Sequence, residues 1–133
     1  MAELTRIEAT GPVIEPGDGS LIEVPSGQQI RLQEVVWNTP GPDGAAVRFR
    51  FVAPAIARVG GGVSFDTAAD DMLHLCQTFA LPHIATGAGP KAPGQIIISL
   101  ADREVTFGAS DPQATQYFEA YRVENGSCIW EAF

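Results

Sequence analysis

Basic residues are scarce in this 133-residue sequence. It has 8 Lys and Arg residues against 16 Asp and Glu residues, for a formal net charge of −8, and Lys91 is its only lysine. Phosphate contacts from basic side chains dominate the affinity of proteins for nucleic acids, so this balance argues against a nucleic-acid-binding protein. It argues equally against binding to an anionic membrane surface.

Long apolar runs and a basic leader are also lacking. No apolar run approaches the roughly 20 residues that span a bilayer, so we expect no membrane insertion. The sequence has no basic-then-apolar secretion signal. Its start, Met1-Ala2-Glu3, is typical of an initiator methionine placed before the mature end of an exported protein, although many cytosolic proteins begin in the same way.

One segment, residues 66–81, has the pattern of an amphipathic helix. Its apolar stripe comprises Ala69, Met72, Leu73, Cys76, Phe79 and Ala80. Asp66 is expected to accept hydrogen bonds from the first free amides, and Asp70 and Asp71 suit the positive end of the helix. Pro82 is predicted to end the helix because it disfavours the α conformation at Leu81, which leaves residues 83–94 as a loop.

The rest of the chain is predicted to form strands and turns. The predicted strands are residues 21–24, 30–37, 47–51, 95–101, 114–124 and 127–133. The segment 95–101 is apolar on both faces, which indicates a central strand. In the segment 30–37, Glu34 falls in the core register, which predicts an edge position or a β-bulge.

Two strands show clear alternation of side chains. In the segment 47–51 the apolar residues are predicted to face the core, and Arg48 and Arg50 to face water. Asn125-Gly126 is the strongest two-residue hairpin signal, and a type I′ turn there pairs Val123 with Cys128 and Tyr121 with Trp130 on the inward face. The opposite face of this hairpin carries Arg122, Ile129 and Glu131.

These elements predict an α+β fold: a single antiparallel sheet of five or six strands, packed on one face against one α-helix. Residues 1–19 are rich in glycine and proline and are interpreted as an extended N-terminal arm. Residues 20–133 are interpreted as the single domain. The other face of the sheet carries Phe118, Ile129 and Phe133, which are therefore candidate contacts for a partner.

The two cysteines, Cys76 and Cys128, are each assigned to a core-facing surface. A disulfide between them would close a loop of roughly 50 residues and contribute about 4 kcal/mol. The residues alone leave two alternatives open, this disulfide and two buried free thiols. A disulfide would imply an oxidising compartment.

Several runs resemble a family of small, uncharacterised proteobacterial proteins that are made with a secretion signal. The runs are LQEVVWN (32–38), RFRFVAPAIAR (48–58), DMLHLC (71–76), ATQYFEAYR (114–122) and CIWEAF (128–133). The resemblance spans residues 30–133 and transfers no functional residue. It implies export, hence a periplasmic or secreted protein whose signal peptide has been removed, and with export it favours the disulfide.

Motifs for catalysis or for a cofactor are weak, so we assign no catalytic, cofactor-binding or metal residue. His74 is about 200° around the helix from Cys76, so the two do not form a thiol–imidazole pair. The Asp66, Asp70 and Asp71 group lacks the spacing of a calcium loop, and the His and Cys residues lack zinc spacing. The glycine clusters near residues 60 and 87 lack the context of a phosphate-binding loop.

The primary hypothesis is therefore a non-catalytic exported domain that binds a protein partner or supports assembly in the cell envelope. The alternative is a small-molecule-binding protein or small enzyme. It would use a pocket between helix and sheet that holds Glu34, Arg48 or Arg50 alongside Tyr121. Trp37, Tyr117, Tyr121 and Trp130 could line such a pocket, and the simpler interpretation places them in the core. The sequence does not determine the oligomeric state.

Overall fold

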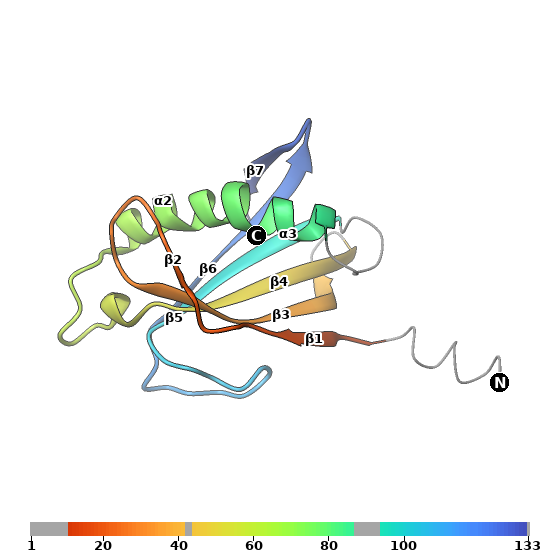
Figure 1. The fold of residues 1–133 in the computed structure, drawn as a ribbon. Helices are drawn as coiled ribbons and strands as arrows, with labels where there is room; N and C mark the ends of the chain where they lie inside the picture. The colour runs from red at the N-terminus through yellow and green to blue at the C-terminus, as the bar shows by residue number, and fades with distance from the viewer. Residues whose placement is uncertain (1–10, 42–43, 87–93, 133) are drawn as a thin grey trace.

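The computed structural model describes residues 11–41, 44–86 and 94–132, and Figure 1 shows one sheet beneath one long helical segment. The elements in chain order are β1 (Val13–Pro16), β2 (Leu21–Ile22), β3 (Ile30–Gly41), β4 (Gly44–Val52), η1 (Pro54–Ile56), α2 (Phe65–Leu75), η2 (Cys76–Ala80), α3 (Leu81–Thr86), β5 (Gln95–Ala101), β6 (Gln116–Glu124) and β7 (Ser127–Glu131). Strands and one helical layer together confirm the α+β class.

The sheet has the order β1-β3-β4-β5-β6-β7, with β2 also paired to β3. The sheet is larger than predicted: in the described residues it has seven strands rather than five or six. It is also not purely antiparallel, because β4 and β5 run parallel. The helical segment lies between these two strands in the chain, and a parallel pair requires such a crossover connection.

The first strand comes from the segment interpreted as an arm. β1 pairs antiparallel with β3, with Val13 opposite Trp37. β3 in turn pairs antiparallel with β4 and carries the β-bulge that Glu34 indicated, between Leu32 and Glu34. The bulge turns Glu34 away from the core while Leu32 remains in it.

The helix begins at Phe65, and its N-cap is Ser64, whose side chain accepts a hydrogen bond from the Thr67 amide. The prediction that Asp66 caps the helix is therefore wrong. The predicted stripe is also rotated, since Leu73 is 45% exposed. The buried residues of α2 and η2 are Ala68, Asp71, Met72, Leu75, Cys76 and Ala80.

The helical segment does not end before Pro82. Leu81 keeps the α conformation, with φ −59° and ψ −50°, and its N–H donates to the carbonyl of Cys76, five residues earlier. This wider π-type turn carries the chain past a proline that has no N–H of its own to donate. Residues 83–86, predicted as loop, are therefore helical in α3, and residues 87–93 lie outside the described residues.

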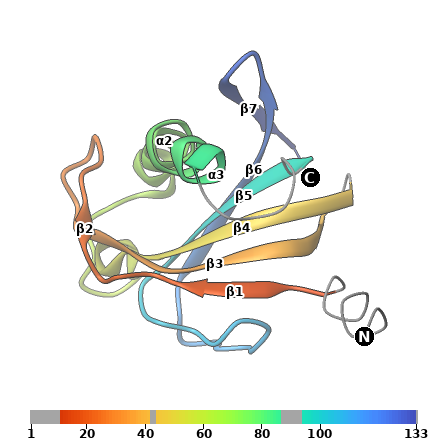
Figure 2. The same ribbon diagram turned by 45° about the vertical axis from the view of Figure 1, so that its right-hand side comes forward.

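The main core lies between the helical segment and one face of the sheet, as Figures 1 and 2 show from two directions. Phe49 and Phe51 of β4 point into it, as the alternation predicted. Every residue of β5 is buried, which confirms a central strand. Tyr121 is buried at the same face, and burial raises the pKa of its hydroxyl.

The closing hairpin has the predicted register, with Val123 opposite Cys128 and Tyr121 opposite Trp130. Asn125 and Gly126 both have positive φ, at 53° and 76°, as a type I′ turn requires. The four side chains do not all reach the core, because Trp130 is 56% exposed. Figure 2 shows the β6–β7 hairpin extending beside the helical segment rather than beneath it.

Candidate functional site

The sheet face that points away from the helix is the first candidate, and we call it the helix-free face. Alternation along each strand fixes its members, because Ile129 follows the core-facing Cys128 and pairs with Arg122. Its residues are Glu34, Val36, Arg48, Arg50, Ile97, Ser99, Phe118, Ala120, Arg122 and Ile129.

Two of the three predicted contact residues, Phe118 and Ile129, lie on this face. Phe118 lies on β6 and is 49% exposed, and Ile129 lies on β7 and is partly buried. Phe133 lies outside the described residues. That these side chains contact a partner remains a prediction.

One end of the helix-free face is covered by residues 102–115, the connection between β5 and β6, which Figure 1 shows on the side of the sheet opposite α2. Arg50 lies beneath it and is only 8% exposed, so the prediction that Arg50 faces water is wrong. Its guanidinium donates to the Glu34 carboxylate and, at 2.8 Å, to the Val105 carbonyl. The charge of Arg50 is thus paired within the chain.

Arg48 is the second basic residue of β4, and its side chain is partly buried rather than free in water. Its guanidinium carbon lies 5.9 Å from the centre of the Phe118 ring. Its Nε is buried without a hydrogen-bond partner, and no ion pair involves Arg48 among the described residues. Burial and the neighbouring Arg50 lower the pKa of Arg48. Arg48 therefore carries a charge that the described chain does not balance.

Arg122, at the edge of the same face, differs from Arg48. Its Nε lies 3.3 Å from Glu124, and its Nη1 lies 3.8 Å from Glu131. The Glu131 carboxylate also accepts a hydrogen bond from Gln95 at 3.0 Å. Acidic side chains from the chain itself therefore surround Arg122.

On the helix side, Cys76 of η2 and Cys128 of β7 lie at disulfide distance, with Cα atoms 6.3 Å apart. Both are buried. Gln77 holds the same contact, since its amide donates to the Gly126 carbonyl and its oxygen accepts from the Cys128 amide, both at 3.0 Å. The helix and the hairpin are thus in contact at one place, through the cysteine pair and through the hydrogen bonds of Gln77.

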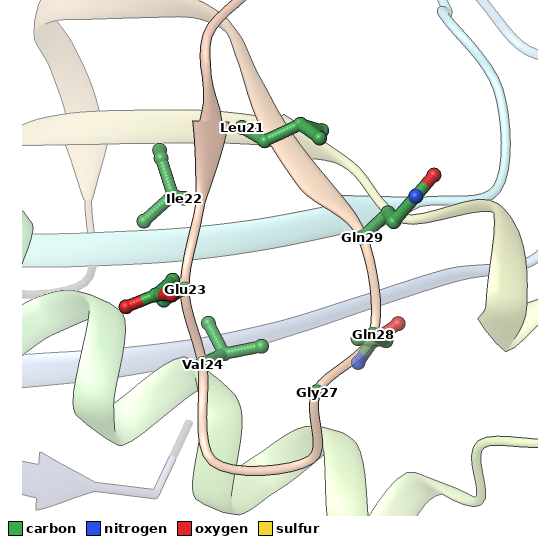
Figure 3. A pocket seen from close by; sticks show the side chains of 7 residues that line it. All are labelled: Leu21, Ile22, Glu23, Val24, Gly27, Gln28 and Gln29. Atoms are coloured by element: carbon green, nitrogen blue, oxygen red, sulfur yellow. The ribbon is translucent and has the colours of Figure 1, made fainter.

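Asp71 was interpreted as part of a charged first turn, yet it is buried. Its carboxylate accepts three hydrogen bonds, from the amide and hydroxyl of Ser26 and, at 2.7 Å, from the side-chain amide of Gln28. Figure 3 shows the loop that carries these partners and the pocket of about 330 Å³ that it borders. The pocket is lined by Leu21, Ile22, Glu23, Val24, Gly27, Gln28 and Gln29. Asp71 thus fastens this loop to the helix.

A second cavity of about 330 Å³ lies where the segment from β1 to β2 meets the end of the helix. His83 Nε2 lies 2.8 Å from Glu15 Oε2, and the other oxygen of Glu15 accepts from the Trp37 indole at 3.0 Å. The His83 ring stacks between Trp37 and Phe79, with ring centres 6.2 and 5.8 Å away. Sequence reasoning missed this cluster, because Glu15 and His83 are 68 residues apart.

The alternative pocket predicted from the sequence does not form. Glu34, Arg48 and Arg50 lie on the helix-free face, whereas Tyr121 lies in the core on the helix side. Trp37 and Tyr121 are buried, while Tyr117 is partly exposed and Trp130 lies largely in water. These residues therefore cannot converge on one ligand.

Within the described ranges, no three His, Cys, Asp or Glu side chains gather in a way that could hold a metal ion. In the same part of the chain, each helix is too short or too polar to cross a bilayer.

Comparison with known proteins identifies a family. The family model described as "Family of unknown function (DUF6497)" matches residues 5–133. The chain belongs to this family. The match supports the resemblance to a family of unknown function, and it extends the likeness beyond residues 30–133 into most of the segment interpreted as an arm. No curated protein and no solved structure matches this chain.

Proposed function

We propose that this member of the family is a non-catalytic, exported domain that binds a protein partner through its helix-free face. The observation that carries the proposal is the pairing of the exposed Phe118 ring with the unbalanced Arg48 on this face. Arginine and aromatic residues are enriched in protein interfaces and among the residues that dominate binding energy.

Location in the periplasm or outside the cell is the second part of the proposal. Support comes from Cys76 and Cys128, which lie at disulfide distance in the core. Disulfides persist in oxidising compartments and are rare in the cytosol of mesophiles. Intact mass of the protein purified from its natural source, with and without reductant before alkylation, tests this part. Two alkylated cysteines without reductant would contradict it.

Affinity capture from the cell envelope of the source organism tests the partner. Phe118→Ser should lose a partner that the wild-type chain retains. Leu73→Ser is the matched control, because Leu73 is a similarly exposed apolar residue on the helix, on the other side of the sheet. If the two variants retain the same proteins as the wild type, the helix-free face is not the binding surface.

The cavity beside His83 favours a second candidate, a small-molecule-binding protein. Its lining combines the Glu15 and Asp18 carboxylates with the apolar side chains of Leu32 and Phe79. A bound ligand raises the melting temperature by mass action, so a thermal-shift screen against small metabolites tests this candidate. It predicts a hit that Phe79→Ala abolishes, and it fails if no metabolite shifts the melting temperature.

A further inference from the structure

We propose that Arg48, with Phe118 beside it, binds a single carboxylate side chain that the partner presents between apolar residues. This inference rests on the proposed function, since it names the chemistry of the partner at the same face. Arg48 is partly buried, has a buried Nε without a partner and makes no ion pair among the described residues. A desolvated cation of this kind gains most from an anion that arrives with a partner.

The local charge distribution determines how many negative charges fit. Arg50 is neutralised by Glu34, and Arg122 by Glu124 and Glu131. Arg48 is the one arginine of the helix-free face, within the described residues, that lacks a carboxylate. One unbalanced cation on the described part of this face complements one carboxylate, whereas a polyanion such as a nucleic acid would be repelled by a chain of net charge −8.

The neighbours of Arg48 determine what must flank that carboxylate. Val36 of β3 pairs with Arg48 on one side, and Ile97 of β5 pairs with it on the other. Ala120 of β6 pairs with Ile97, one strand further along the sheet. All three are buried apolar residues. The exposed Phe118 ring adds a further apolar surface at 5.9 Å from the guanidinium. A carboxylate flanked by apolar side chains matches this surface, and the low local polarity strengthens the ion pair.

Two blocked peptides provide the probe: acetyl-Ala-Leu-Glu-Leu-Ala-amide and the same peptide with Gln in place of Glu. Binding is measured by NMR titration of the ¹⁵N-labelled protein, followed at the Arg48 side-chain Nε–H and the Phe118 amide. The charged peptide should bind about tenfold more tightly than the Gln peptide, because Gln still accepts a hydrogen bond from Arg48 but lacks the negative charge that makes the pair a charge-assisted one. Arg48→Met should remove this preference.

Arg122→Met is the matched control, because Arg122 lies on the same face with carboxylates of its own. It should keep the tenfold preference. Equal binding of the two peptides, no binding of either, or a preference that survives in Arg48→Met would each overturn the inference. The proposed function fails separately, by the capture experiment with Phe118→Ser, so a partner that depends on Phe118 without this preference would contradict only the carboxylate.

Discussion

Asp71 on the helix side and Arg48 on the helix-free face are both withdrawn from water, and the chain balances only the first of these two charges. On the helix side, Asp71 is fully enclosed and accepts three hydrogen bonds from Ser26 and Gln28. On the helix-free face, Arg48 is partly enclosed, its guanidinium lies over the Phe118 ring, and it makes no ion pair among the described residues. Buried polar groups are normally satisfied, so the first charge stabilises this fold and the second indicates an interaction outside it.

The largest expected effect concerns the two cysteines on the helix side, which lie at disulfide distance. The double variant Cys76→Ala with Cys128→Ala should lower the free energy of unfolding by about 4 kcal/mol, because the unfolded chain regains the freedom of a closed loop. The cysteines are 52 residues apart in sequence. Urea unfolding measures the loss of free energy, and reduced wild-type protein should unfold at the same urea concentration as the variant. Equal stability of oxidised, reduced and variant protein would show that no bond forms.

Asp71→Ala should lower the free energy of unfolding by about 3 kcal/mol, because the donors of Ser26 and Gln28 lose their acceptor. Asp70→Ala is the matched control, since Asp70 is exposed and next in the chain, and it should change stability by less than about 0.5 kcal/mol. Urea unfolding of both variants checks the difference. Similar losses in the two would contradict the role given to Asp71.

Arg48→Met should have the opposite sign and stabilise the isolated domain by about 1 kcal/mol, because a partly desolvated, unpaired charge is replaced by an apolar side chain of similar length. Arg50→Met should destabilise it, because Glu34 and the Val105 carbonyl lose their donor. Differential scanning calorimetry compares the two melting temperatures. If Arg48→Met lowered the melting temperature as much as Arg50→Met does, Arg48 would have to be paired within the fold.

The smallest effect is expected at Trp130, which belongs to the helix side by register and yet is largely exposed. Trp130→Ser should change the free energy of unfolding by less than about 0.5 kcal/mol. Acrylamide should quench Trp130 fluorescence far more than that of Trp37, which is buried, as single-tryptophan variants would measure. Equal quenching would mean that the hairpin lies closer to the helix than described.

Local signals in the sequence predicted local structure well. Asn125-Gly126 gave the register of the closing hairpin, since a two-residue turn leaves no freedom in pairing. Alternation placed Phe49 and Phe51 in the core, and Glu34 indicated the bulge.

Two errors are local, since Ser64 rather than Asp66 caps the helix and the helical segment continues past Pro82. The other errors concern partners that are distant in the chain. The sequence of the helix could not show that Asp71 is buried, because its partners lie 45 and 43 residues away. Arg50 was expected in water because the connection that covers it begins about fifty residues later, so alternation within β4 carried no sign of a cover. Glu15 and His83 meet for the same reason, through tertiary packing alone.

A photoreactive amino acid at position 118, with one at position 73 for comparison, tests the helix-free face most directly. In cells of the source organism, position 118 should yield a discrete crosslinked product that maps to a segment with one acidic residue between apolar residues. The product should disappear with Arg48→Met, and position 73 should not give it. No product at position 118, or the same product from both positions, would contradict the account.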